Sequence, residues 1–125
     1  MHWNFERIGS PRFIRIVASR VFSSTQFAKM LDDLISLKYS RFGVRLLFDY
    51  RKLDLTEADP LELMEASDQV VSRNPELAFT TIATLFESPE SMEIAERFGE
   101  ITDHRFLAYV KRFIDEADAI KWVNS

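Results

Sequence analysis

The sequence predicts a single α/β domain with a mixed, mostly parallel sheet of about five strands and about four helices. The chain has 125 residues, which is near the usual size of one domain. Segments rich in β-branched and aromatic residues alternate with segments of helical periodicity, and short turns join them. Such alternation is typical of β-α-β crossovers, whose strands run parallel. We therefore expect residues 1–125 to form one domain around one sheet.

The N-terminal segment predicts two adjacent strands or a β-hairpin. Apolar and polar side chains alternate over Trp3–Ile8, and β-branched side chains are frequent over Phe13–Ala18. A turn signal formed by Gly9, Ser10 and Pro11 separates the two runs.

The first helix is predicted to begin after Ser23, an N-cap residue with which Gln26 completes a capping box. Spacings of three and four residues then mark one face of an amphipathic helix, at Phe27, Met30, Leu31, Leu34 and Lys38. Gly43 is expected to close this segment.

The middle of the chain predicts a strand and then a helix. Val44–Tyr50 has the apolar centre of an interior strand. The clearest helix start in the chain follows at Asp59-Pro60-Leu61-Glu62, because these residues supply a cap, a pre-set φ and an acid in the first turn. Pro75 is expected to stop this helix, whose buried stripe is predicted at Leu63, Met64, Ser67, Val70 and Val71.

The C-terminal half repeats this pattern with weaker boundaries. In chain order we predict a strand over Leu77–Phe86, a helix beginning at Ser88-Pro89-Glu90, a strand over Phe106–Val110, and a helix over Glu116–Val123 that Asp115 opens. Gly99 is expected at the end of the third helix or just inside its last turn.

Composition excludes several classes of protein. The net charge of −4 argues against a nucleic-acid module that relies on a basic face. With no Cys, the chain has no disulfide framework, thiolate metal site or Cys nucleophile. The longest charge-free run, Leu77–Phe86, is too short to span a bilayer, and no signal peptide is visible. We expect a cytoplasmic protein that does not bind nucleic acid.

No catalytic motif is present in the sequence. The three glycines stand apart, so no Gly-rich phosphate loop exists, and no serine lies in a Gly-x-Ser-x-Gly elbow. His2 and His104 are too few for a histidine metal cluster, and His104 is expected in a polar turn between a helix and a strand. We therefore predict a protein that is not an enzyme and needs no cofactor.

Three groups of side chains leave two interpretations open. The densest carboxylates fit either a magnesium or acid/base site, or helix caps and an exposed loop: Asp49, Asp54, Glu57, Asp59 and Glu62. Asp49 is predicted at the carboxyl edge of the sheet, where ligands of such sheets bind. The Phe residues, with Trp3 and Trp122, fit either an apolar-ligand pocket or a core. The arginines Arg12, Arg15, Arg20 and Arg45 fit either a basic patch or solvated strand faces.

Three hydrophobic stretches carry a family resemblance: Val44–Asp49, Leu77–Pro89 and Val110–Val123. They resemble the central strand ending in Asp, the next strand with its helix start, and the closing strand, acidic turn and short helix of the SpoIIAA-like family. This family lies within the STAS (sulfate transporter and anti-sigma-factor antagonist) and Sec14-like fold group. The resemblance covers about residues 3–123 and implies the fold of that group.

Anti-sigma-factor antagonists of this family carry an Asp-Ser-Ser-Gly motif at the helix start after the central strand, where serine phosphorylation controls partner binding. A phosphate there would meet free backbone N–H groups and the positive end of the helix dipole. Counting from Asp49, the motif falls on Glu57, Ala58, Asp59 and Pro60, so both serines are lost. Asp59 supplies a fixed carboxylate instead, and Thr56 is a nearby hydroxyl.

The resemblance implies a non-enzymatic module that binds a protein partner through an interaction surface at Asp54, Thr56, Glu57, Ala58, Asp59 and Pro60. The Sec14 side of the resemblance implies an alternative, namely a binder of a lipid or other apolar ligand with membrane association. A homodimer is compatible with both. The observation that separates them is whether the core is closed or holds an apolar cavity with a mouth.

Overall fold

The computed structural model describes residues 1–9, 12–37 and 45–125, apart from the side chains of residues 12, 100 and 101. Within these residues one sheet holds five strands in chain order: β1 (His2–Gly9), β2 (Arg12–Val21), β3 (Arg45–Asp54), β4 (Thr81–Leu85) and β5 (Tyr109–Phe113). β1 is an edge strand antiparallel to β2, and every later pair is parallel. The predicted mixed, mostly parallel sheet with the N-terminal run at an edge is therefore confirmed.

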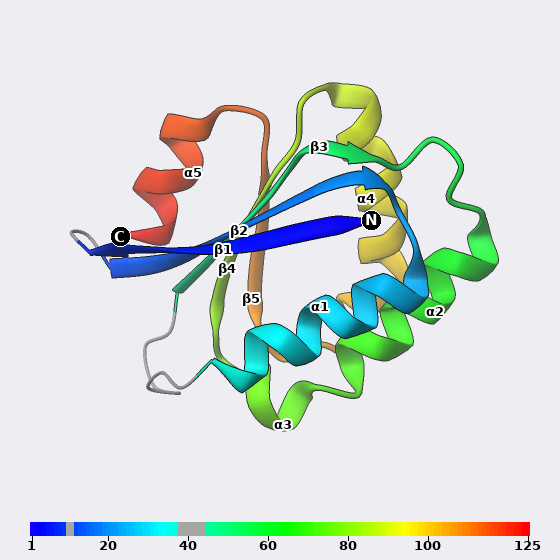
Figure 1. Cartoon of the computed structure of the whole chain (residues 1–125), viewed down its shortest axis with the longest axis horizontal. Helices are drawn as coiled ribbons and strands as arrows, with labels where there is room; N and C mark the ends of the chain where they lie inside the picture. Colours follow the sequence, from blue (N-terminus) through cyan, green and yellow to red (C-terminus); the bar gives the residue numbers. More distant parts are fainter. Residues whose placement is uncertain (10–11, 38–44) are drawn as a thin grey trace.

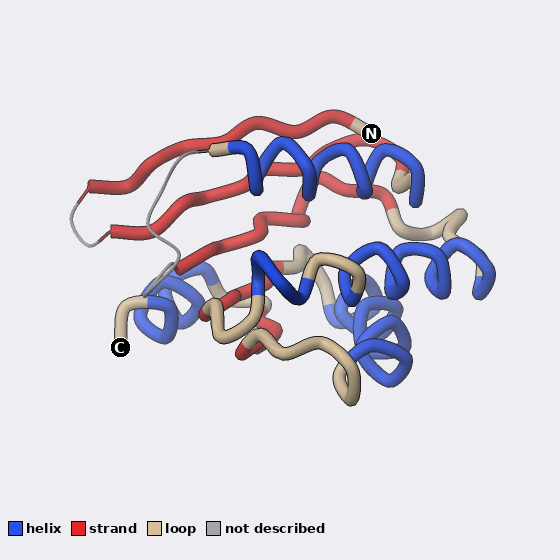
Figure 2. The backbone as a smooth tube through the Cα atoms, turned by 90° about the horizontal axis from the view of Figure 1, so that it is seen from below, coloured by secondary structure: helices blue, strands red, loops and turns tan. Residues whose placement is uncertain are grey.

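Five helices occur in the described part of the chain: α1 (Ser24–Ser36), α2 (Pro60–Val71), α3 (Asn74–Leu77), α4 (Pro89–Thr102) and α5 (Glu116–Val123). Figure 1 shows α1, α2 and α4 on one side of the sheet and α5 on the other. In Figure 2, turned by 90°, α2 and α4 lie together and α5 stands apart from them. We call these two sides the three-helix face and the α5 face.

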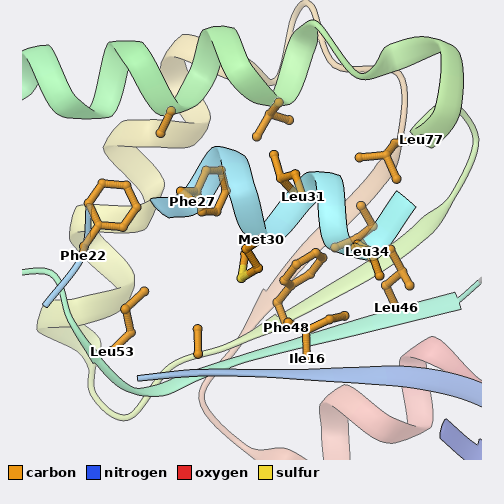
Figure 3. Close-up of a cluster of buried hydrophobic side chains, with 14 of the residues drawn as sticks. Ile16, Phe22, Phe27, Met30, Leu31, Leu34, Leu46, Phe48, Leu53 and Leu77 are labelled. Atoms are coloured by element: carbon orange, nitrogen blue, oxygen red, sulfur yellow. The ribbon is translucent and has the colours of Figure 1, made fainter. Parts of the chain in front are cut away.

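The core is divided in two by the sheet, and the alternation of side chains along β3 shows this directly. Leu46 and Phe48 belong to a large cluster with α1, whereas Leu47, between them, belongs to a small cluster with Ala119 and Val123 of α5. In Figure 3, side chains of α1 lie over those of β2 and β3 on the three-helix face. A strand buried on both faces reads as a continuous apolar run, which is why this segment was predictable.

Helix starts follow local signals, and all four predicted N-caps are confirmed. Each cap side chain accepts a hydrogen bond from the backbone N–H three residues on, at 3.3 Å for Ser23, 2.8 Å for Asp59, 3.2 Å for Ser88 and 2.9 Å for Asp115. These bonds satisfy N–H groups that have no partner inside the helix.

The start of the predicted strand over Leu77–Phe86 is wrong. Leu77 ends the short helix α3, and β4 begins only at Thr81. Pro75 was expected only to stop α2, but it also lies at the start of α3, where its fixed φ is suitable. Phe79 then adopts φ 64°, a left-handed conformation that interrupts the extended run.

The other predicted boundaries differ in smaller ways. The last strand lies three residues later than Phe106–Val110, because its pairing with β4 begins at Tyr109 opposite Thr81. β3 continues past Tyr50 to Asp54. Gly99 lies just inside the last turn of α4, which ends at Thr102, in agreement with one of its two predicted places. Met64, predicted in the buried stripe of α2, is 51% exposed.

Some predicted features lie outside the described residues, namely Ser10, Pro11, Lys38, Gly43 and Val44. None of the helices in the part of the chain that the structure covers has the length and apolar content needed to cross a bilayer.

Candidate functional site

The predicted interaction surface lies in the turn between β3 and the start of α2. Asp54 Oδ1 accepts hydrogen bonds from the backbone N–H of Thr56 at 2.9 Å and from its hydroxyl at 2.6 Å, which lowers the pKa of Asp54. Asp59 Oδ1 accepts the backbone N–H of Glu62, as a cap. Ala58 packs against the core, and Glu57 and Pro60 are exposed. The two aspartates thus each hold local backbone.

Two apolar side chains stand exposed beside this turn. Leu61 is 63% exposed and Met64 is 51% exposed, one helical turn apart on α2. The predicted surface therefore combines acidic residues with an apolar strip. Met64 of this strip had been predicted in the buried stripe of the helix.

Asp49 lies elsewhere than predicted. β3 runs on to Asp54, so Asp49 is in the middle of the strand and not at its carboxyl edge. Its side chain is buried on the α5 face, whereas Asp54 and Asp59 are exposed at the end of β3 and the start of α2. The five carboxylates do not meet, and no group of three or more His, Asp or Glu suited to a metal ion occurs among the residues described.

On the α5 face, two arginines and two carboxylates form a closed ring, which we call the ion cluster: Arg15, Asp49, Arg51 and Glu116. Arg15 and Arg51 each donate to Asp49 Oδ2 at 2.7 Å. The same two arginines donate to Glu116, at 2.7 Å and 3.3 Å. The cluster ties the first turn of α5 to β2 and β3.

The electrostatics of the ion cluster centre on Asp49. Burial alone would raise the pKa of Asp49, but hydrogen bonds from Arg51 and Arg15 outweigh it and lower the pKa to about 2. The hydrogen bond from Arg15 also lowers the pKa of Glu116. The charges cancel in number, so the cluster is a structural ion network with all four groups engaged.

Of the two interpretations of the four arginines, a basic patch is not formed by the described side chains. Arg15 is engaged in the ion cluster, and Arg45 donates to the backbone oxygens of Val123 at 2.6 Å and Ser125 at 3.0 Å. Arg20 is exposed near the end of β2, and the side chain of Arg12 is not among those that the structure describes. His104 is exposed in the turn after α4, as predicted.

An apolar cavity of about 110 Å³ lies on the three-helix face, between the sheet and α1, α2 and α4. Six phenylalanines line it: Phe22, Phe27, Phe48, Phe86, Phe98 and Phe106. The two interpretations of the Phe-rich composition were therefore not exclusive, since several core phenylalanines also face a cavity. The core on this face is not closed.

Polar side chains also line the cavity: Tyr50, Thr84, Thr102, Asp103 and Arg112. Thr84 of β4 pairs with Arg112 of β5, so the two side chains are neighbours on the side of the sheet that faces the cavity. Arg112 Nη2 donates to Asp103 Oδ1 at 3.2 Å. A Cβ atom built on Gly99 would lie 1.8 Å from Arg112 Nη2, so glycine here leaves room for the guanidinium against α4.

Sequence reasoning missed the polar members of the cavity. Gly99 was interpreted as a helix-end signal, and Arg112 was interpreted as part of a strand and turn. The available signal was the alternation of Phe106, Ala108 and Val110, which places Arg112 on the same side, but the predicted strand ended at Val110 and so did not include Arg112.

Comparison with known proteins supports the fold. No family model matches the chain, and no curated protein matches it. The chain is similar to the crystal structure of an uncharacterized DUF3478 protein with a SpoIIAA-like fold from Shewanella loihica. The TM-score is 0.61 at 14% identity, and the likeness covers 98% of this chain and 92% of that one. The chain therefore has a SpoIIAA-like fold, as its sequence resemblance predicted.

Proposed function

We propose that this SpoIIAA-like domain binds a small apolar ligand in the cavity between the sheet and α1, α2 and α4. The observation that carries the proposal is a cavity of about 110 Å³ in the main core, lined by Phe side chains and reached by a few polar groups. A mostly apolar pocket with a few convergent polar groups is the usual form of a small-molecule site.

Energetics favour an occupied cavity. The cavity is partly open, so without a ligand its Phe side chains are exposed to water, which costs free energy in proportion to the apolar area. An apolar ligand that fills it recovers lost contacts and keeps water away from the Phe side chains.

The volume limits the ligand. An engineered cavity of about 150 Å³ in another protein binds benzene, so 110 Å³ suits an apolar group of about that size. A long acyl chain would extend beyond this volume. The proposed ligand is therefore a small apolar molecule. This class is narrower than the alternative implied by the resemblance, which was a lipid or other apolar ligand.

A cavity-filling variant tests this proposal. Toluene serves as the probe, and amide NMR shifts report where it binds. We expect toluene to shift resonances of residues around the cavity in the wild type and not in Ala95→Leu, whose larger side chain extends from the cavity wall. Ala117→Leu, at an exposed position of α5, is the matched control and keeps the wild-type response. No shifts in the wild type, or equal shifts in Ala95→Leu, would contradict the proposal.

A second candidate function is docking of a protein partner at the start of α2. It is favoured by Leu61 and Met64, which expose apolar surface next to the acidic residues of the turn. A partner with an apolar patch and basic residues would complement this strip. Its test is capture from the source cell with Leu61→Gln and Met64→Gln: a partner that binds all variants equally would exclude this surface.

A further inference from the structure

Arg112 lies in the wall of the apolar cavity, which is an unusual place for a charged side chain. Its side chain is only 20% exposed, and it lies against Gly99 of α4. Asp103 is its one carboxylate partner among the described residues. Arg112 reaches it through Nη2 alone, at 3.2 Å and 3.5 Å from the two oxygens.

This pairing leaves much of the guanidinium unused. A guanidinium has five N–H donors and matches a carboxylate best through two parallel hydrogen bonds. The Nε and Nη1 groups of Arg112 have no hydrogen-bond partner in the part of the chain that the structure covers. By contrast, Arg51 of the ion cluster uses both Nε and Nη2 on Asp49, at 2.9 Å and 2.7 Å.

Tyr50 provides a second unused donor in the same cavity. Its ring packs between Phe48 and Phe86, at centroid distances of 5.7 Å to each. Tyr50 is half-buried, and its hydroxyl, which forms no hydrogen bond to a described residue and is not sealed from solvent, can donate to a ligand. Burial raises the pKa of Tyr50, so the hydroxyl keeps its proton and is available as a donor.

We infer that the cavity binds a small carboxylate, with its apolar body among the Phe side chains and its carboxylate paired to Arg112 and reached by the Tyr50 hydroxyl. The inference rests on the proposed function and names its ligand class. An aromatic or branched body of about the size of benzene fits the volume. Asp103 then acts as a competitor that neutralises Arg112 when the ligand is absent.

Two probes of matched shape test the inference, namely benzoate and the neutral benzyl alcohol, each titrated by NMR or calorimetry. We expect Arg112→Gln to weaken benzoate about tenfold or more, since hydrogen bonds between charged groups have this magnitude. Benzyl alcohol should change less than about twofold. Arg97→Gln, an exposed arginine on α4 away from the cavity wall, is the control and should change neither.

Two further variants exclude a purely structural role for Arg112. Asp103→Asn removes the competing carboxylate, so benzoate should bind more tightly while benzyl alcohol is unaffected. Tyr50→Phe should weaken benzoate a few-fold without loss of folding, because it keeps the aromatic ring and removes only a hydroxyl that has no partner among the described residues. Arg112→Lys retains the charge and should bind benzoate with intermediate affinity.

The outcomes separate the two proposals. If toluene, benzoate and benzyl alcohol all fail to bind the wild type, the cavity is not a ligand site and both proposals fail. If benzyl alcohol binds in the cavity but benzoate binds no better, or if Arg112→Gln and Asp103→Asn leave benzoate unchanged, the carboxylate inference is wrong and the apolar site stands.

Discussion

The two faces of the sheet solve the same packing problem in different ways. On the three-helix face, three long helices and many aromatic side chains enclose the main core but leave about 110 Å³ unfilled. On the α5 face, one short helix covers a small apolar cluster, and the ion cluster joins its first turn to the sheet. The first face has spare volume and unused donors, whereas the second has charges that satisfy one another. The comparison teaches that the face with more helices is the less completely packed one, which is why the proposed ligand site lies there.

The largest effect is expected from breaking the ion cluster. Asp49→Asn leaves Arg15 and Arg51 without their shared carboxylate, and removal of one partner of a buried pair costs about 3–5 kcal/mol. Because Arg51 is 36% exposed, water can replace part of the contact, so we expect about 2–4 kcal/mol. Urea unfolding measures the loss. Glu93→Gln, from an exposed ion pair on α4, is the control and should change stability by less than about 0.5 kcal/mol.

The same carboxylate predicts an acid-dependent loss of stability. Its pKa is about 2 in the folded protein against an ordinary 3.8, so the stabilisation is complete above about pH 4 and is lost as the pH falls towards 2. A difference of this size corresponds to about 2 kcal/mol. The free energy of unfolding, measured at pH steps from 5 to about 2, should fall less steeply in Asp49→Asn. Parallel slopes in the two proteins would show that Asp49 is not the titrating group.

Alanine-to-leucine changes on the two faces sharpen the packing contrast. Ala83 is fully buried in the α5-face cluster, so Ala83→Leu overpacks it and should cost about 1–3 kcal/mol. Ala95 lines the cavity, so Ala95→Leu should leave stability unchanged or raise it by about 1 kcal/mol. Thermal melts of both variants measure the difference. Equal destabilisation would indicate that the cavity cannot take up added side-chain volume.

Much of the fold could be predicted because its signals are local. Ser23, Asp59, Ser88 and Asp115 act on backbone N–H groups three residues away, so each helix start could be inferred from a few residues. Strand ends depend instead on the partner strand, which is why β4 and β5 begin later than their apolar runs.

The candidate sites were hidden because they are built from distant residues. Arg15 and Glu116 are separated by 101 positions, and the sheet brings them together only when β2, β3 and α5 are in place. Gly99, Asp103 and Arg112 are closer in sequence, but their contact depends on β5 continuing past Val110, where the predicted strand ended. The acidic turn at Asp54–Asp59 was predictable as an interaction surface because the family motif and the cap signals are local; its two aspartates also hold local backbone, and the surface stays a prediction.

The smallest effects are expected at the helix caps, which also allow the two faces to be compared. Asp59 caps α2 on the three-helix face, and Asp115 caps α5 on the other. Asp59→Ala should cost about 1 kcal/mol, and Asp59→Ser only a few tenths, because serine caps nearly as well. Asp115→Ala removes an equivalent hydrogen bond from the start of α5. The residue that follows Asp115 is Glu116, which belongs to the ion cluster. If fraying of α5 also loosens the cluster, Asp115→Ala will cost clearly more than Asp59→Ala, and the excess will vanish in an Asp49→Asn background. Equal costs in urea unfolding would show instead that the ion cluster holds α5 independently of its cap.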